Sequence, residues 1–156
     1  EVMTNETGFP RRVFLIGGSA FVLVACAPAG PGAVTLVAQG TAGMNPGPDG
    51  ADRPLTLQVL QLRGAGAFDG ADFFALQNPA GTLGGDLVKA DTIALTPGAS
   101  VTKTVSLAPS TAILAIVAGF RDPAGKQFRA KSAVSATDEV TFKLDVTAGG
   151  IKLTPM

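Results

Sequence analysis

The sequence predicts an all-β protein: a two-sheet β-sandwich of about eight strands with one short helical insertion. Three observations support this. Short stretches of alternating apolar and polar residues recur along the chain, and Gly, Pro, Asn and Asp separate them. No window longer than about ten residues shows helical periodicity. A chain of 156 residues with 46% hydrophobic residues can fill one core.

Eight segments are predicted as strands. The clearest is 140–146, where apolar residues at every second position face the core and the polar residues between them face solvent. The segment 113–120 is apolar at nearly every position, which is typical of a central strand covered on both faces. The other six are expected at 34–38, 55–62, 87–95, 101–107, 127–133 and 151–154.

Within 55–62 the apolar pattern changes phase. Leu57 and Val59 belong to one alternating set, whereas Leu60 and Leu62 belong to the other. One extra residue near Val59 and Leu60 would keep both sets on the core side, so we predict a β-bulge there.

One short helix interrupts the strands. Its start is indicated by Phe68, Asp69, Asp72 and Phe73. Asp69 is expected as the N-cap, Asp72 stands at the capping-box position, and the two aromatic residues stand where a hydrophobic staple closes. Asn78 is expected as the C-terminal cap, and Pro79 prevents continuation.

The aromatic residues around this helix permit two interpretations. Phe68, Phe73 and Phe74 could close an open side of the sandwich as part of the core. They could instead line a pocket for a small ligand.

The first residues have the pattern of an export signal. Arg11 and Arg12 precede an uncharged apolar run over 13–25, which is shorter than the roughly 20 residues that a membrane-spanning helix needs. The run ends in small residues before Cys26 and resembles a bacterial lipobox. We therefore predict a signal peptide over 1–25, a lipidated linker over 26–32 with the lipid on Cys26, and a sandwich domain over 33–156. If the aromatic residues line a pocket, the protein would instead be a generic periplasmic ligand-binding lipoprotein.

Two finer features bear on export and sorting. The adjacent arginines also fit a twin-arginine signal, so the export route stays open. Ala27 follows the cysteine where an Asp would signal inner-membrane retention, and this favours the outer membrane.

Composition excludes several functions. The 12 basic and 12 acidic residues cancel, so no net charge attracts nucleic acid. His is absent and Cys occurs once, which removes the commonest general base and any thiolate zinc cluster. We expect no metal and no cofactor apart from the covalent lipid on Cys26.

The remaining routes to catalysis are weak, so we predict that the protein is not an enzyme and has no small-molecule substrate. The carboxylate pairs Asp69/Asp72 and Asp138/Glu139 lie at element boundaries, where capping explains them. Lys131 and Ser132 are strand neighbours that face opposite sides of a sheet. The glycine-rich stretch 43–50 lacks the Lys-Ser/Thr ending of a phosphate loop.

A fifteen-residue segment without periodicity, 40–54, joins the first two strands. Hairpin loops usually take about two to five residues, and longer ones in compact domains tend to be functional or disordered. Its prolines lower the entropy lost on binding, while Met44 offers an adaptable contact and Arg53 a forked donor. Partner binding and an idle linker both remain open on these grounds.

Several motifs, taken in order, resemble the TssJ/VasD lipoproteins of bacterial type VI secretion systems. The matching features are Cys26 after the apolar run, Asn45-Pro46, Gly50, Arg53-Pro54-Leu55, Val59-Leu60-Gln61-Leu62, Ala67-Phe68-Asp69, Asp72-Phe73-Phe74-Ala75-Leu76, Leu95-Thr96-Pro97-Gly98, Ala118-Gly119-Phe120-Arg121-Asp122 and Phe128-Arg129-Ala130. Leu60 and Phe128 depart from the family, which usually has Tyr and Trp there.

The resemblance implies a transthyretin-like sandwich anchored by lipid in the outer membrane, on its periplasmic face. It implies that the loop after the first strand binds the periplasmic domain of the inner-membrane subunit TssM, which helps to assemble the membrane complex. On this sequence that role falls on Met44, Asn45, Pro46, Asp49 and Arg53.

Overall fold

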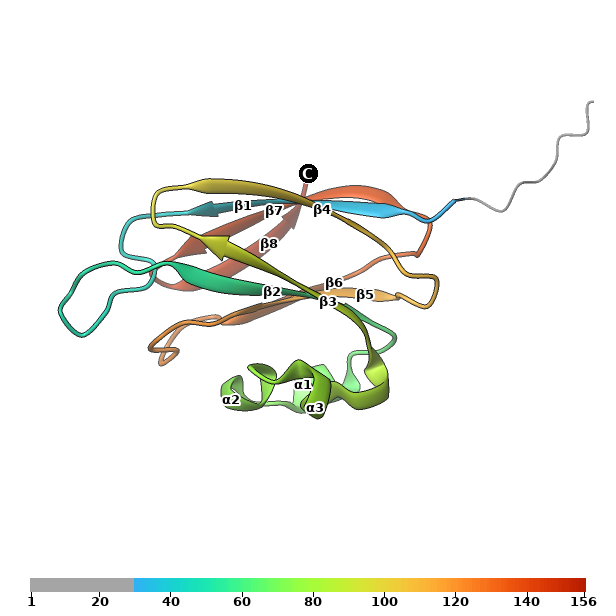
Figure 1. The fold of residues 1–156 in the computed structure, drawn as a ribbon, viewed down its shortest axis with the longest axis horizontal. Helices are drawn as coiled ribbons and strands as arrows, with labels where there is room; N and C mark the ends of the chain where they lie inside the picture. Colours follow the sequence, from blue (N-terminus) through green and yellow to red (C-terminus); the bar gives the residue numbers. More distant parts are fainter. Residues whose placement is uncertain (1–29) are drawn as a thin grey trace, which may run out of the picture.

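Two four-stranded β-sheets pack face to face around an apolar core (Figure 1). The structure is a computed structural model and describes residues 30–156. The predicted signal peptide over 1–25 and the predicted lipid attachment at Cys26 lie outside these residues. Within residues 30–156, no helix has both the length and the apolar character needed to cross a bilayer.

The first sheet has the strand order β4-β1-β7-β8, with β1 parallel to β7 and the other neighbours antiparallel. Its strands are β1 (Ala33–Gly40), β4 (Ser100–Ser106), β7 (Glu139–Thr147) and β8 (Gly150–Pro155). The second sheet has the order β3-β2-β5-β6 and is antiparallel throughout. Its strands are β2 (Leu55–Leu62), β3 (Leu87–Leu95), β5 (Ile113–Ala118) and β6 (Arg129–Ala133).

The sequence prediction of an eight-strand sandwich is confirmed. In β7 the apolar residues Phe142, Leu144 and Val146 are buried at alternate positions, as a strand with one core face requires. Strand β5 lies between β2 and β6, and every residue from Leu114 to Ala118 is buried. This is the predicted central strand covered on both faces.

The bulge predicted at Val59 and Leu60 is wrong. The pairing of β2 with β5 runs without a shift from Leu57 to Leu62, and the pairing with β3 shifts only between Gln61 and Leu62. The two apolar phases instead face two different cores. Val59 lies between the sheets, whereas Leu60 and Leu62 pack under the helical insertion on the outer face.

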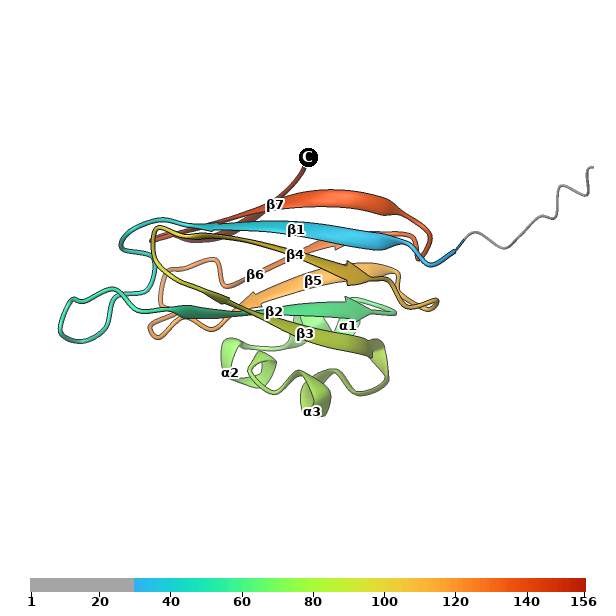
Figure 2. The same cartoon turned by 45° about the horizontal axis from the view of Figure 1, so that its top comes forward.

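The helical insertion is confirmed, but it consists of three short helices (Figure 2). They are α1 (Gly66–Gly70), α2 (Phe73–Leu76) and α3 (Pro79–Leu83), followed by the 3₁₀ turn η1 (Gly84–Asp86). They cover the outer face of the second sheet (Figure 1). Arg129 of β6 fixes α1 there by donating to the carbonyls of Phe68 and Ala71 at 2.8 and 2.6 Å.

The predicted capping roles in this insertion need correction. Asp72 is the N-cap of α2 and accepts from the Ala75 amide, whereas Asp69 lies inside α1 and pairs with Lys131. Asn78 caps the start of α3 instead of ending a helix. Pro79 is therefore the first residue of a new helix, where its missing N–H costs nothing.

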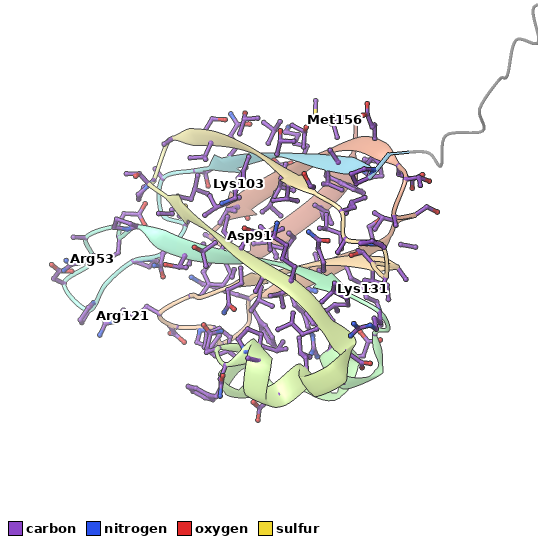
Figure 3. The ribbon with its side chains drawn as sticks, turned by 45° about the vertical axis from the view of Figure 1, so that its right-hand side comes forward. Arg53, Asp91, Lys103, Arg121, Lys131 and Met156 are labelled. Atoms are coloured by element: carbon purple, nitrogen blue, oxygen red, sulfur yellow. The ribbon has the colours of Figure 1, made fainter. Side chains whose placement is uncertain are left out.

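The strands define two ends of the sandwich (Figure 1). We call one the loop end; it holds the β1–β2 loop (41–54), the β3–β4 turn (96–99), the β5–β6 loop (119–128) and the β7–β8 turn (148–149). The other is the entry end, where the described chain begins; it holds 30–32, 63–65, 107–112 and 134–138. In Figure 3, Arg53 and Arg121 project at the loop end.

Candidate interaction site

The β1–β2 loop has regular internal hydrogen bonds. Pro46 and Asp52 form a β-bridge, and the Arg53 amide donates to the Asn45 carbonyl at 2.9 Å. Beyond the bridge, the Gly47 amide donates to Ala51 at 2.7 Å and the Gly50 amide donates to Gly47 at 3.0 Å. The segment that lacked periodicity in the sequence is thus a small hairpin, and we call residues 46–53 its tip.

Asp52 organises the base of this hairpin. Its carboxylate accepts the Gly43 amide at 2.6 Å and the Asn45 amide at 2.9 Å. These backbone hydrogen bonds, the one from Asn45 first, lower the pKa of the Asp52 carboxyl below its usual value. The charged form of Asp52 therefore holds the chain between Gly43 and Asn45 in its turn.

Met44 does not lie on the loop surface, contrary to its predicted role as a partner contact. Its side chain is fully buried and belongs to the core between the sheets. Its sulfur packs against Gly40, where a Cβ atom would lie only 2.7 Å from Met44 Sδ. Met44 fixes the loop to the core instead of offering an adaptable surface.

Asn45 is also buried, and its side chain joins two loops. Its Nδ2 donates to the Pro54 carbonyl at 3.1 Å, and its Oδ1 accepts the Arg121 amide at 2.9 Å. The predicted contact role of Asn45 is therefore corrected to a supporting one. Of the five predicted partner-binding residues, the exposed ones are Pro46, Asp49 and Arg53.

These exposed residues lie on the tip and hold each other in place. Arg53 donates to Asp49 Oδ2 at 3.0 Å, although each side chain stays more than half exposed. The other Asp49 oxygen accepts the Ala51 amide at 3.1 Å. The tip therefore presents a guanidinium, a carboxylate and two prolines (Pro46 and Pro48) in a defined shape.

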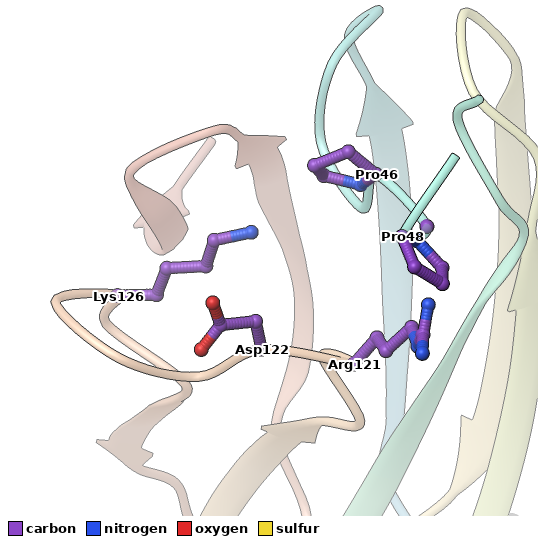
Figure 4. Close-up of a pocket in the computed structure, with 6 residues that line it drawn as sticks. Pro46, Pro48, Arg121, Asp122 and Lys126 are labelled. Carbon is purple, nitrogen blue, oxygen red and sulfur yellow. The ribbon is translucent and has the colours of Figure 1, made fainter. Parts of the chain in front are cut away.

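The β5–β6 loop completes the site, and sequence reasoning missed it as a contributor. Pro46, Gly47, Pro48, Arg121, Asp122 and Lys126 line a depression of about 400 Å³ between the two loops (Figure 4). Lys126 Nζ donates to the Met44 carbonyl at 3.3 Å and lies 4.8 Å from the Phe120 ring centre. Only the antiparallel pairing of β2 with β5 brings these residues beside the tip.

The three aromatic residues proposed for a ligand pocket differ in their positions, and Phe68 borders a surface depression of about 210 Å³ together with Asp69, Arg129 and Lys131. Phe68 is buried in the core under the helices, while Phe74 is 79% exposed. Phe73 lies between Phe74 and Phe128, with edge-to-face ring distances of 5.4 and 5.3 Å. These positions favour the interpretation of the aromatic residues as part of the core and its cover.

Three of the four acidic residues singled out in the sequence have a structural partner, and the fourth, Glu139, is exposed at the start of β7. Asp72 caps α2, Asp69 pairs with Lys131 at 2.5 Å, and Asp138 accepts the Ser135 amide at 2.8 Å. In the described part of the chain, no three His, Cys, Asp or Glu side chains gather in a way that could hold a metal ion.

The fold and the site define a class of protein, a β-sandwich domain that presents braced loops at one end of its two sheets. A family model described as "Type VI secretion lipoprotein, VasD, EvfM, TssJ, VC_A0113" matches residues 33–149. The chain belongs to this family. The family is a structural, membrane-associated lipoprotein component of a secretion complex and is not a known enzyme family.

Solved structures agree with the family. The lipoprotein TssJ1 of Pseudomonas aeruginosa is 31% identical with a TM-score of 0.74, over 81% of this chain and 97% of that chain. Lip of Serratia marcescens, a membrane-bound component of the type VI secretion system, is 25% identical with a TM-score of 0.73, over 81% and 96%. A search of curated protein sequences gave no match.

A third solved structure shares the fold at lower identity. It is described as "T6SS protein TssM C-terminal domain (869-1107) from EAEC", and its matching chain is 20% identical with a TM-score of 0.69, over 80% of this chain and 98% of that chain. At this identity the likeness concerns the fold alone.

Proposed function

We propose that this chain is an outer-membrane lipoprotein that anchors the type VI secretion membrane complex. Lipid on Cys26 holds one end of the sandwich at the membrane. The tip at the other end binds the periplasmic domain of a TssM-like inner-membrane protein. The protein acts as a fixed attachment point and catalyses no reaction.

The membership of a lipoprotein family supports lipid attachment. Cys26 is the only cysteine, and it follows an apolar run that ends in small residues. Several acyl chains each contribute roughly 0.8 kcal/mol per buried methylene, so such an anchor is nearly permanent. The test is palmitate labelling with membrane fractionation; label and membrane association should both disappear in Cys26→Ser.

The observation that carries the docking proposal is an exposed tip on a buried base. Met44 and Asn45 fix the base to the core and to the β5–β6 loop, while Asp49 and Arg53 remain exposed above it. A loop already held in one shape loses little entropy on binding. The tip and the depression beside it thus form a preorganised surface at the loop end.

The partner is proposed from the resemblance to the TssJ/VasD lipoproteins, which implies binding to a TssM periplasmic domain. Two solved structures whose matching chains share this fold have descriptions that name the C-terminal domain of TssM and the "Type VI membrane complex". Both chains are 20 to 21% identical to this one. For this chain, a TssM-like periplasmic domain is therefore the partner to test first.

The decisive variant removes the outer part of the tip, residues 47–51 with Asp49, and leaves Arg53 without its ion-pair partner, while the base of the hairpin is kept. Residues 47–51 are replaced by Asn-Gly, because Pro46 and Asp52 form the last bridged pair and a two-residue turn can close them. Asn45 and Asp52 keep their hydrogen-bonding groups. We expect loss of capture of the TssM-like periplasmic domain with an unchanged thermal unfolding midpoint.

The matched control is Phe74→Ala, which removes an exposed aromatic ring from α2 and leaves the loop end intact. It should capture the partner as the unmodified chain does. Normal capture by the chain without the tip would refute the docking proposal. Loss of capture by the Phe74 variant would move the interface to the helices.

A further inference from the structure

An apolar depression lies at the entry end, away from the tip. Pro31, Leu107, Pro109, Ala136 and Thr137 line it, and its volume is about 470 Å³. Its lining residues come from the start of the described chain and from the 107–112 and 134–138 segments, and these segments lie together at the entry end.

The entry end carries fewer charged residues than the loop end. The segments 30–32 and 107–112 have none, 134–138 has Asp138, whose carboxylate accepts the Ser135 amide, and the exposed Glu139 follows at the start of β7. Arg63, in the remaining segment, donates to the Gly85 carbonyl beneath the helices. By contrast, the two main loops of the loop end carry Asp49, Asp52, Arg53, Arg121, Asp122 and Lys126.

Backbone hydrogen bonds fix the point where the chain enters the sandwich. The Gly32 amide donates to Ala136 at 2.7 Å, and the Leu107 amide donates to Gly32 at 2.8 Å. A Cβ atom at Gly32 would lie 2.2 Å from the Asp138 carbonyl oxygen, so the surrounding backbone closes tightly on this residue. The segment between Cys26 and Gly32 is therefore the covalent spacer between lipid and domain.

This spacer is short. Six residues span at most about 20 Å when fully extended, at roughly 3.5 Å each. A lipid on Cys26 thus keeps the entry end within that distance of the bilayer surface. At such a high effective concentration, a weak apolar contact is enough to seat the domain.

We propose that the entry-end depression is a membrane seat, which rests on the interfacial layer of the same bilayer that holds the lipid on Cys26. The inference relies on the proposed lipid attachment and adds an orientation to it. Apolar side chains without charge suit the boundary between headgroups and acyl chains. The eight residues of β1 span roughly 26 Å at about 3.3 Å per residue, so the loop end lies about that far from the entry end.

The test uses single tryptophans, because the chain has none of its own. Thr137→Trp puts an indole at the seat. Thr96→Trp is the matched control, since Thr96 is an exposed turn residue at the loop end and lies outside the proposed docking loop. Each full-length lipidated variant is reconstituted in phosphatidylethanolamine and phosphatidylglycerol vesicles with brominated acyl chains.

We expect the indole at position 137 to lose at least about twofold more fluorescence than the one at position 96, since interfacial side chains reach ~5–10 Å into the headgroup boundary. Adding Pro109→Asp should reduce the quenching at position 137, because it places a charge in the seat. Equal quenching at the two positions would overturn the proposal. So would an indole at position 137 that is shielded from aqueous quencher but untouched by brominated lipid.

The seat and the anchor can fail separately. A chain that takes up palmitate yet shows no quenching at position 137 loses the seat and keeps its anchor. A chain that takes up no palmitate loses the anchor itself, and with it the basis of the seat.

Discussion

Each end of the sandwich holds one buried side-chain amide, and the two differ in what they support. At the entry end, Gln61 donates to the Ser106 carbonyl at 2.9 Å and accepts from the Ala108 amide and the Thr111 hydroxyl, each at 2.8 Å. At the loop end, Asn45 joins the Pro54 carbonyl to the Arg121 amide. Each amide provides the hydrogen bonds that the nearby backbone groups would otherwise make with water.

The difference lies outside these amides. Above Asn45 the chain extends into an exposed tip of prolines and charged residues, whereas the segment 107–112, which Gln61 holds, has no charged residue. Similar internal bracing thus supports two chemically different surfaces. In our account one faces a protein partner and the other faces lipid.

The largest expected effect comes from Met44→Ala. It removes a fully buried side chain beneath the loop and should lower the free energy of unfolding by about 2–5 kcal/mol. Leu107→Ala is the matched control, because it also shortens a buried apolar side chain but does so at the entry end. Chemical denaturation should show comparable losses for both, but only the Met44 variant should also weaken partner capture.

The next effect comes from Gln61→Leu. It leaves the Ala108 amide, the Thr111 hydroxyl and the Ser106 carbonyl without their partner, at a cost of about 1–3 kcal/mol for a buried unsatisfied group. Denaturation measures the loss. Partner capture by the folded variant should be unchanged, because the tip does not depend on this amide; weakened capture would mean that the two ends are coupled.

Asn45→Ala should have a smaller effect on stability and a larger one on binding. It leaves the Arg121 amide and the Pro54 carbonyl unpaired and frees the β5–β6 loop from the tip. Calorimetric titration with the TssM-like domain should show weaker binding with a greater entropic cost. Unchanged affinity would show that the β5–β6 loop has no part in the site.

The smallest effect is a pH dependence confined to the loop end. Because the pKa of Asp52 is lowered from 3.8, its carboxylate stabilises the loop above that ordinary value, and this contribution is lost as the pH falls through the lower folded pKa. Amide NMR signals of Gly43 and Asn45 should report the change on acidification. Asp52→Asn should abolish it, and signals at the entry end should not follow it.

The strands could be predicted from the sequence, because alternating burial leaves a direct pattern. The segment 140–146 shows it in full, and the observed strand covers 139–147. The caps of the helical insertion could be predicted only in part: the sequence singles out Asp72, whose bond reaches three residues along the chain, but it places the N-cap at Asp69.

What could not be predicted depends on distant parts of the chain. The second apolar phase of β2 suggested a bulge, because nothing local shows that helices cover its outer face. The sequence predicts Met44 at the surface, because the loop that contains it shows no regular alternation of apolar and polar residues. In the structure Met44 is buried by core residues from other strands. Arg121 and Asn45 are 76 positions apart in the sequence, and they meet only because β2 pairs with β5.

The central claim is that the partner contacts the exposed charges of the tip directly. The paired change Asp49→Arg with Arg53→Asp tests it, because it keeps the opposite charges of the internal ion pair and exchanges the charges presented to the partner. Calorimetric titration of the TssM-like periplasmic domain should give a much weaker affinity for this variant, with unfolding unchanged. An affinity equal to that of the unmodified chain would contradict the account.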